Sequence, residues 1–171
     1  MAQQVPQQIT QPYAFKVRQR FFTFIRKFYD IFDLATEQKV LVAKTKILTF
    51  FPQIIVEDLA GREVVRIKSN WLRTSWKIYQ GDNLIGEVKF PFIRFCGIKF
   101  TVFMAGNAYE ASDIIGWNFT AKDRNGNVGF LLDRKLFRIR DTYQVVVYPP
   151  LEPIFALAAA LTIDMRYYER R

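Results

Sequence analysis

The chain of 171 residues contains no histidine and a single cysteine, Cys96. Without histidine it lacks the usual general base, the commonest metal ligand and the side chain that titrates near neutral pH. One cysteine excludes a disulfide within the chain and fits a reducing compartment. None of the three serines lies in a Gly-x-Ser-x-Gly turn, and neither a P-loop nor a Gly-x-Gly-x-x-Gly motif is present. We therefore expect a protein that is not an enzyme and needs no cofactor.

The first twelve residues are rich in glutamine, include Pro6 and Pro12, and carry no charged side chain. They show no basic segment followed by an apolar run, so we expect no signal peptide. The chain as a whole is half hydrophobic, and the part after these residues is long enough for one core. We expect a flexible tail over residues 1–13 and a single domain over residues 14–171, in a cytoplasmic protein that is at most peripheral to a membrane and is not secreted.

Short segments that mix aromatic, aliphatic and basic residues recur along the chain. They occupy residues 20–24, 46–50, 70–74, 91–95, 115–119 and 135–139. Their spacing of roughly 20–25 residues is typical of repeated supersecondary units. The recurrence favours a structural role in the core for the segment 20–27; insertion at a membrane surface and stacking on single-stranded bases are the alternatives.

The stretches between these segments have the pattern of β-hairpins. Residues 53–58 and 63–68 are rich in β-branched side chains and flank a turn that contains Asp58 and Gly61. The pairs 77–80 with 84–88 and 119–122 with 128–131 repeat the pattern. Six such hairpins predict about twelve antiparallel strands, and a sheet of that size must curl, split or close.

The end of the chain does not follow this hairpin pattern. Residues 154–163 are uncharged and rich in alanine and leucine, which predicts a helix over about residues 151–168. A helix that is apolar on every side either spans a membrane or is enclosed by protein. A span needs about 20 apolar residues, and this run is shorter and ends at Asp164. We therefore predict a mainly β fold, a closed antiparallel barrel around a hydrophobic C-terminal helix, with Asp164 paired to Arg166 or to an arginine on a strand.

Three parts of the chain resemble the LURP-one-related family. They are residues 18–33, residues 133–145 and the apolar helix that runs into Ile163 and Asp164. The resemblance extends over about residues 14–171. It implies kinship with the phospholipid scramblases and the tubby C-terminal domain, whose fold is a twelve-stranded barrel around a C-terminal helix. Tubby domains bind phosphoinositides through basic side chains, and scramblases are associated with calcium-dependent lipid movement.

The calcium-binding-like stretch of the scramblases corresponds here to residues 141–152. Only Asp141 and Glu152 carry carboxylates in that stretch. Calcium requires six to eight oxygen ligands, several of them carboxylates. We therefore predict no metal site, with these two residues as the only weak candidates.

The formal net charge of +9 and the sequence pI near 9.8 favour an anionic partner. Basic residues two apart in a strand share a face, and similar positions recur in successive hairpins. The candidates for binding an anion or a phospholipid are Arg18, Arg20, Lys44, Lys46, Arg66, Lys68, Lys89, Arg134 and Lys135. The alternative is an ordinary polar outer surface.

These observations predict a non-enzymatic module of the LURP-one and scramblase-like type that binds phospholipid or another anion at a membrane surface. The alternative is an adaptor that binds nucleic acid or protein through the same basic surface.

Overall fold

A computed structural model describes residues 11–20, 26–46, 50–92, 97–104, 106–113, 118–134 and 142–168. It contains twelve strands, one α-helix and one π-helical turn. The strands are β1 (Tyr13–Arg20), β2 (Phe28–Asp33), β3 (Lys39–Lys46), β4 (Gln53–Asp58), β5 (Glu63–Ser69), β6 (Ser75–Gln80), β7 (Asn83–Lys89), β8 (Ile98–Met104), β9 (Asn107–Asp113), β10 (Asn118–Lys122), β11 (Val128–Asp133) and β12 (Thr142–Val147). The helix is α1 (Pro153–Ile163), and the π-helical turn is η1 (Asp164–Tyr168).

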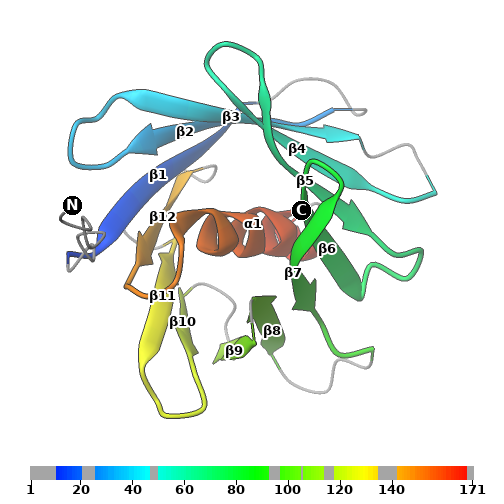
Figure 1. Cartoon of the computed structure of the whole chain (residues 1–171), viewed down its shortest axis with the longest axis vertical. Helices are drawn as coiled ribbons and strands as arrows, with labels where there is room; N and C mark the ends of the chain where they lie inside the picture. Colours follow the sequence, from blue (N-terminus) through cyan, green and yellow to red (C-terminus); the bar gives the residue numbers. More distant parts are fainter. Residues whose placement is uncertain are drawn as a thin grey trace, which may run out of the picture.

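The twelve strands form one closed antiparallel barrel (Figure 1). Each strand pairs with its neighbours in sequence, and β1 closes the ring by pairing with β12, with Tyr13 opposite Val147. Closure leaves no unpaired edge strand in this sheet, which removes the usual route to edge-to-edge aggregation. The predicted barrel is confirmed.

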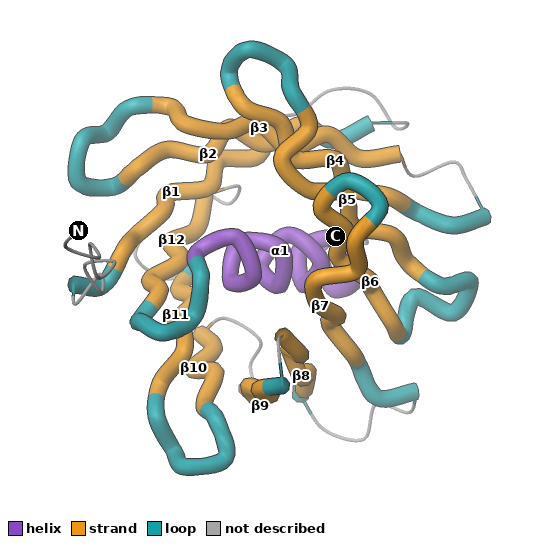
Figure 2. The backbone as a smooth tube through the Cα atoms, in the orientation of Figure 1, coloured by secondary structure: helices purple, strands orange, loops and turns teal. Residues whose placement is uncertain are grey.

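The strand order gives the barrel two different ends. Because successive strands run in opposite directions, the connections after odd-numbered strands all lie at one end, which we name the loop end. The connections after even-numbered strands lie at the other, which we name the turn end, together with the start of α1. Figure 2 shows the connections in teal around the orange strands.

Two predicted hairpin turns are held by aspartate side chains. Asp58 accepts hydrogen bonds from the backbone N–H groups of Ala60 and Arg62, both at 2.9 Å. Asp123 does the same for Asn125 and Asn127. The backbone hydrogen bond from Arg62 holds the pKa of Asp58 below its usual value, and the side-chain hydrogen bond from Asn127, with the backbone ones, does the same for Asp123. The turn geometry is thus encoded locally, which is why these hairpins were predictable.

Helix α1 lies in the middle of the ring of strands (Figure 1). All of its residues from Phe155 to Ile163 are buried, and it has no polar face. It begins at Pro153, two residues later than predicted, and proline suits the first helical turn because its missing N–H would have no partner there. Ile154, the second residue of the helix, is only partly buried, because it lies at the mouth of the barrel.

Strand β7 passes very close to the start of the helix. A Cβ atom on Gly86 would lie 2.7 Å from the ring of Phe155 and 2.8 Å from the carbonyl oxygen of Phe103. Neither distance is compatible with a side chain, so glycine at this position lets the barrel wall close around Phe155.

The described parts of the repeated segments lie at the loop end of the barrel. Phe50 and Trp71 lie in connections there and are 85% and 70% exposed, whereas Phe119 lies in β10 and is buried in the core. The period therefore marks the loop end, and the core role expected for the segment 20–27 stays a prediction, because most of that segment lies outside the described residues. Residues 21–25 of the first copy, like Cys96 and the tail over residues 1–10, lie outside the described residues.

No helix in the described part of the chain has the length and hydrophobicity needed to cross a membrane. Because the helix is enclosed, the stability of the barrel depends on the apolar side chains of α1.

We predict that Leu157→Ala lowers the free energy of unfolding by about 2–5 kcal/mol, because it leaves a cavity at a fully buried site. The matched control is Leu84→Ala at a 56% exposed position, which should change it by no more than about 0.5 kcal/mol. Urea denaturation measures both. Similar losses in the two variants would contradict the enclosed helix.

Candidate anion-binding surface

Four neighbouring strands place a row of cations on the outer wall of the barrel. In the strand register Lys46 is opposite Gln53, Gln53 is opposite Lys68, and Lys68 is opposite Lys77. We name these four residues on β3, β4, β5 and β6 the lysine row. All three lysines are exposed, and they lie near the loop end of their strands.

The lysine row contains a direct like-charge pair. Lys68 and Lys77 are register partners, an arrangement that is destabilising in a sheet unless a counter-charge is near. The ammonium group of Lys68 lies 5.3 Å from the centre of the Tyr79 ring, a favourable cation–π contact that leaves its charge in place. Glu87 on β7 is the register partner of Lys77 and supplies one negative charge, but its carboxylate also pairs with Lys89 at 3.5 Å and accepts a hydrogen bond from Ser75. Lys68 and Lys77, with Lys89 near them, therefore carry more positive charge than the single carboxylate of Glu87 offsets.

The next row towards the turn end is neutralised. Lys44 pairs with Glu57 at 2.6 Å, and Arg66 pairs with Glu63 at 2.5 Å. The hydrogen bond that Arg66 donates to Glu63 raises the pKa of Arg66 above its usual value. Lys44 and Arg66 share the outer face with the lysine row, as the sequence predicted, but each already has a carboxylate partner.

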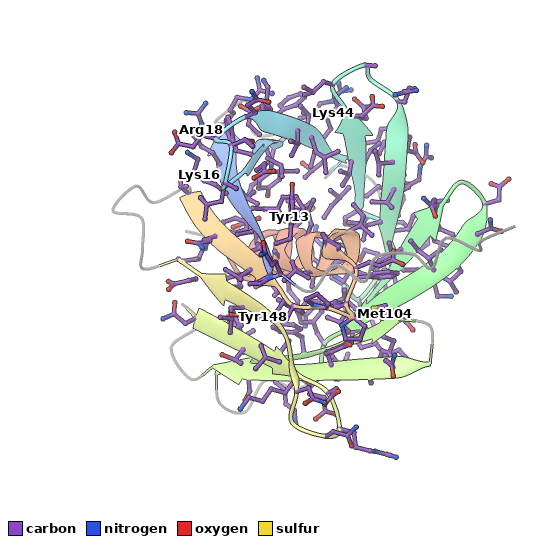
Figure 3. All side chains as sticks on the ribbon, turned by 60° about the vertical axis from the view of Figure 1, so that its left-hand side comes forward. Tyr13, Lys16, Arg18, Lys44, Met104 and Tyr148 are labelled. Carbon is purple, nitrogen blue, oxygen red and sulfur yellow. The ribbon has the colours of Figure 1, made fainter. Side chains whose placement is uncertain are left out.

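Strand β1 carries two further candidates for anion binding, Arg18 and Arg20, which lie beside the buried carboxylate of Asp30. Arg20 lies 2.9 Å and Arg18 lies 3.8 Å from the same carboxylate oxygen of Asp30, and Lys39 approaches the other oxygen at 3.5 Å. Asp30 is buried, so it needs these cations for its own stabilisation. Figure 3 shows Lys16, Arg18 and Lys44 on the outer side of the barrel.

Arg134 is turned inwards to the end of the helix. Its guanidinium pairs with the buried carboxylate of Asp164, which also accepts a 2.7 Å hydrogen bond from the Tyr29 hydroxyl. Arg166, the other predicted partner, instead donates to the backbone carbonyl of Arg73 and lies over the Phe90 ring. Arg134 therefore has a structural partner, and Asp164 joins the helix to strand β2 and to the residue that directly follows β11 at the loop end.

The remaining candidates for anion or metal binding lie apart from one another. Lys89 lies at the loop end of β7, over the ring of Phe103. Glu152 is exposed just before α1, while Lys135 and Asp141 lie outside the described residues. Within the described ranges no three His, Cys, Asp or Glu side chains come together as metal ligands.

Sequence reasoning missed Lys77. The signal was the alternation around it, since Trp76 and Ile78 are buried and Lys77 must then face outwards. Its position opposite Lys68 depends on the register of β5 with β6, which the sequence pattern did not define.

Two pockets border the barrel wall. A polar pocket of about 330 Å³ is lined by Glu63, Arg66, Lys68, Tyr79, Gly81 and Asp82. Its two carboxylates disfavour an anion, so the exposed lysine row beside it is the better candidate.

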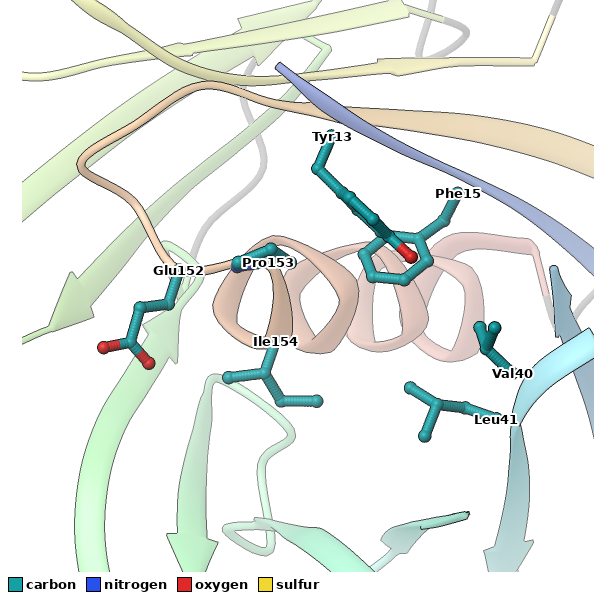
Figure 4. Close-up of a pocket in the computed structure, with 7 residues that line it drawn as sticks. All are labelled: Tyr13, Phe15, Val40, Leu41, Glu152, Pro153 and Ile154. Carbon is teal, nitrogen blue, oxygen red and sulfur yellow. The ribbon is translucent and has the colours of Figure 1, made fainter. Parts of the chain in front are cut away.

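An apolar pocket of about 410 Å³ opens at the turn end and is lined by Tyr13, Phe15, Val40, Leu41, Glu152, Pro153 and Ile154 (Figure 4). Burial, together with Asp33, raises the pKa of Tyr13 to about 12, so this pocket presents a neutral hydroxyl.

Comparison with known proteins identifies one family. The family profile described as LURP-one-related matches residues 13–164, which include every strand and all of helix α1. No curated protein matches the chain significantly.

We predict that Asp164→Asn and Arg134→Gln each lower the free energy of unfolding by about 3–5 kcal/mol, because each leaves one charge without its partner in a buried site. The double variant should lose clearly less than the sum of the two. A double-mutant cycle by chemical denaturation measures the coupling. Additive losses would show that the pair does not act as a unit.

Proposed function

We propose, from the premise that the chain belongs to the LURP-one-related family, that it is a non-enzymatic module that binds anionic phospholipid at a membrane surface. The observation that carries this proposal is the lysine row, above all Lys68 directly opposite Lys77. A like-charge pair weakens a free sheet, whereas a bound phosphate between the two ammonium groups would stabilise it.

The mechanism is electrostatic. Each Lys or Arg near an anionic leaflet contributes about 1 kcal/mol, so the three lysines of the row supply a weak, reversible attraction. The formal net charge of +9 adds long-range steering towards an anionic surface. Neighbouring strands are about 4.8 Å apart, so the row spans roughly 15 Å and suits several headgroups rather than one enclosed ligand.

The same charge could serve an adaptor that binds nucleic acid or protein. Phosphates of single-stranded nucleic acid would meet the lysine row as lipid phosphates do, and exposed aromatic side chains could stack on bases. A competition experiment distinguishes the two proposals. If the partner is the lipid surface, a single-stranded oligonucleotide should displace the protein from vesicles only weakly.

We predict that the triple variant Lys46→Glu, Lys68→Glu and Lys77→Glu loses most of its binding to vesicles that contain phosphatidylglycerol. The matched control is Arg62→Glu, Lys122→Glu and Arg124→Glu, which changes the net charge equally at exposed sites near the turn end. Vesicle co-sedimentation measures both, and melting temperatures verify that both variants are folded. Equal losses would mean diffuse attraction without a site.

Binding should weaken steeply with salt, because the screening length falls from about 10 Å at 0.1 M to about 3 Å at 1 M. A calcium chelator should leave it unchanged, as expected for a stretch before the helix that is poor in acidic residues. Titration of vesicles at several salt concentrations, with and without calcium, makes the measurement. A strict calcium requirement, or equal binding to phosphatidylcholine alone, would contradict the mechanism.

A further inference from the structure

Three neighbouring connections at the loop end expose large apolar side chains together. The exposed fractions are 85% for Phe50, 56% for Phe51, 70% for Trp71, 49% for Leu72 and 72% for Phe92. We name these five residues the loop tips. They belong to the β3–β4, β5–β6 and β7–β8 connections, and each of these strands is paired with the next in the sheet.

The concentration at this end is unusual. Among the described residues, Leu59, Leu84 and Phe103 are the other large hydrophobic side chains that are exposed, and none of them lies at the loop end. Scattered exposed apolar residues need no explanation, but a group gathered on one face marks an interaction site.

Charge is divided between the two ends in the same half of the barrel. At the loop end of β3–β8, the strands carry one carboxylate, Glu87, and five lysines: Lys46, Lys68, Lys77, Lys89 and Lys99. The described parts of the connections that hold the loop tips contain no acidic residue. The turn end of the same strands carries Glu57, Asp58, Glu63 and Asp82 against Lys39 and Arg62. An anionic surface would therefore attract the loop end and repel the turn end.

The apolar and basic groups are also layered along the barrel axis. The lysines lie on the strand ends, and the loop tips lie in connections that extend beyond them, with Phe50 four residues after Lys46 in the chain. An anionic bilayer has layers in the same order, with phosphates outside and acyl chains about 5–10 Å further in. Tryptophan and phenylalanine are favoured at that boundary, and the aliphatic Leu72 fits it better than it fits a base-stacking platform.

We infer that the loop end is the membrane-docking face: the loop tips insert into the acyl boundary of an anionic bilayer while the five lysines meet its phosphates. The inference rests on the proposed function and adds to it an orientation and an apolar contribution. The barrel stands with its loop end on the membrane, and its turn end, with the apolar pocket, faces the solution.

The test compares a tip variant, Phe50→Ser with Phe92→Ser, with a turn-end control, Leu59→Ser with Leu84→Ser. All four positions are more than half exposed, so both variants should keep the wild-type melting temperature. Vesicles of phosphatidylcholine with phosphatidylglycerol are the probe. The tip variant should bind at least about tenfold more weakly than wild type, and the control should bind as wild type does.

Trp71 reports insertion directly. On binding, the tryptophan emission should shift to the blue and be quenched by brominated phosphatidylcholine in the same vesicles. The variant Trp71→Phe should lose that change, which separates Trp71 from the buried Trp76 and from Trp117.

The outcomes separate the two proposals. If wild type binds these vesicles but the tip variant binds equally well and Trp71 is not quenched, the inference is wrong while the proposed function stands. If wild type does not bind them at all, both are wrong. If a single-stranded oligonucleotide binds more tightly than the vesicles at matched salt, and the tip variant loses that binding, the occupant of this face is nucleic acid and the membrane inference is overturned.

Discussion

The structure depends on one constraint, which is that helix α1 is apolar on every side and must be enclosed. Burying nine consecutive residues from Phe155 to Ile163 requires a wall all around the helix, and a closed barrel provides it. Small side chains let the wall approach, as Gly86 does beside Phe155. The helix ends where its first acid, Asp164, meets Tyr29 and Arg134, so the buried charge fixes the helix at the loop end.

Much of this fold was predictable because its signals are local. Turns held by Asp58 and Asp123, the alternation of buried and outward residues, and the uncharged run before Asp164 can each be read within a short window. The partner of Asp164 was not, because Arg134 is 30 positions away and Tyr29 is 135 positions away, and only barrel closure brings them together. The lysine row likewise depends on strand register, because a slip of one residue would move the side chains of a strand to the other face of the sheet.

The repeated aromatic segments show that a recurring pattern does not by itself determine burial. Their period marks the loop end of the barrel, where Trp71 is exposed in a connection and Phe119 is buried in β10. An apolar residue such as Trp71 predicts burial only when it lies on an inward position of a strand or helix, and in a connection it remains exposed. The repeat becomes informative once the fold is known, because its exposed members include the loop tips, which lie beside five lysines.

The most direct test of the account is hydrogen–deuterium exchange with and without vesicles that contain phosphatidylglycerol. We expect α1 to exchange slowly in both states, because it is enclosed, and we expect vesicles to protect peptides that contain the loop tips at residues 50–52, 70–74 and 90–92. The turns at residues 59–62 and 81–82 should be unaffected. Protection at those turns in place of the loop tips, or rapid exchange of α1 on the membrane, would contradict an intact barrel that docks through its loop end.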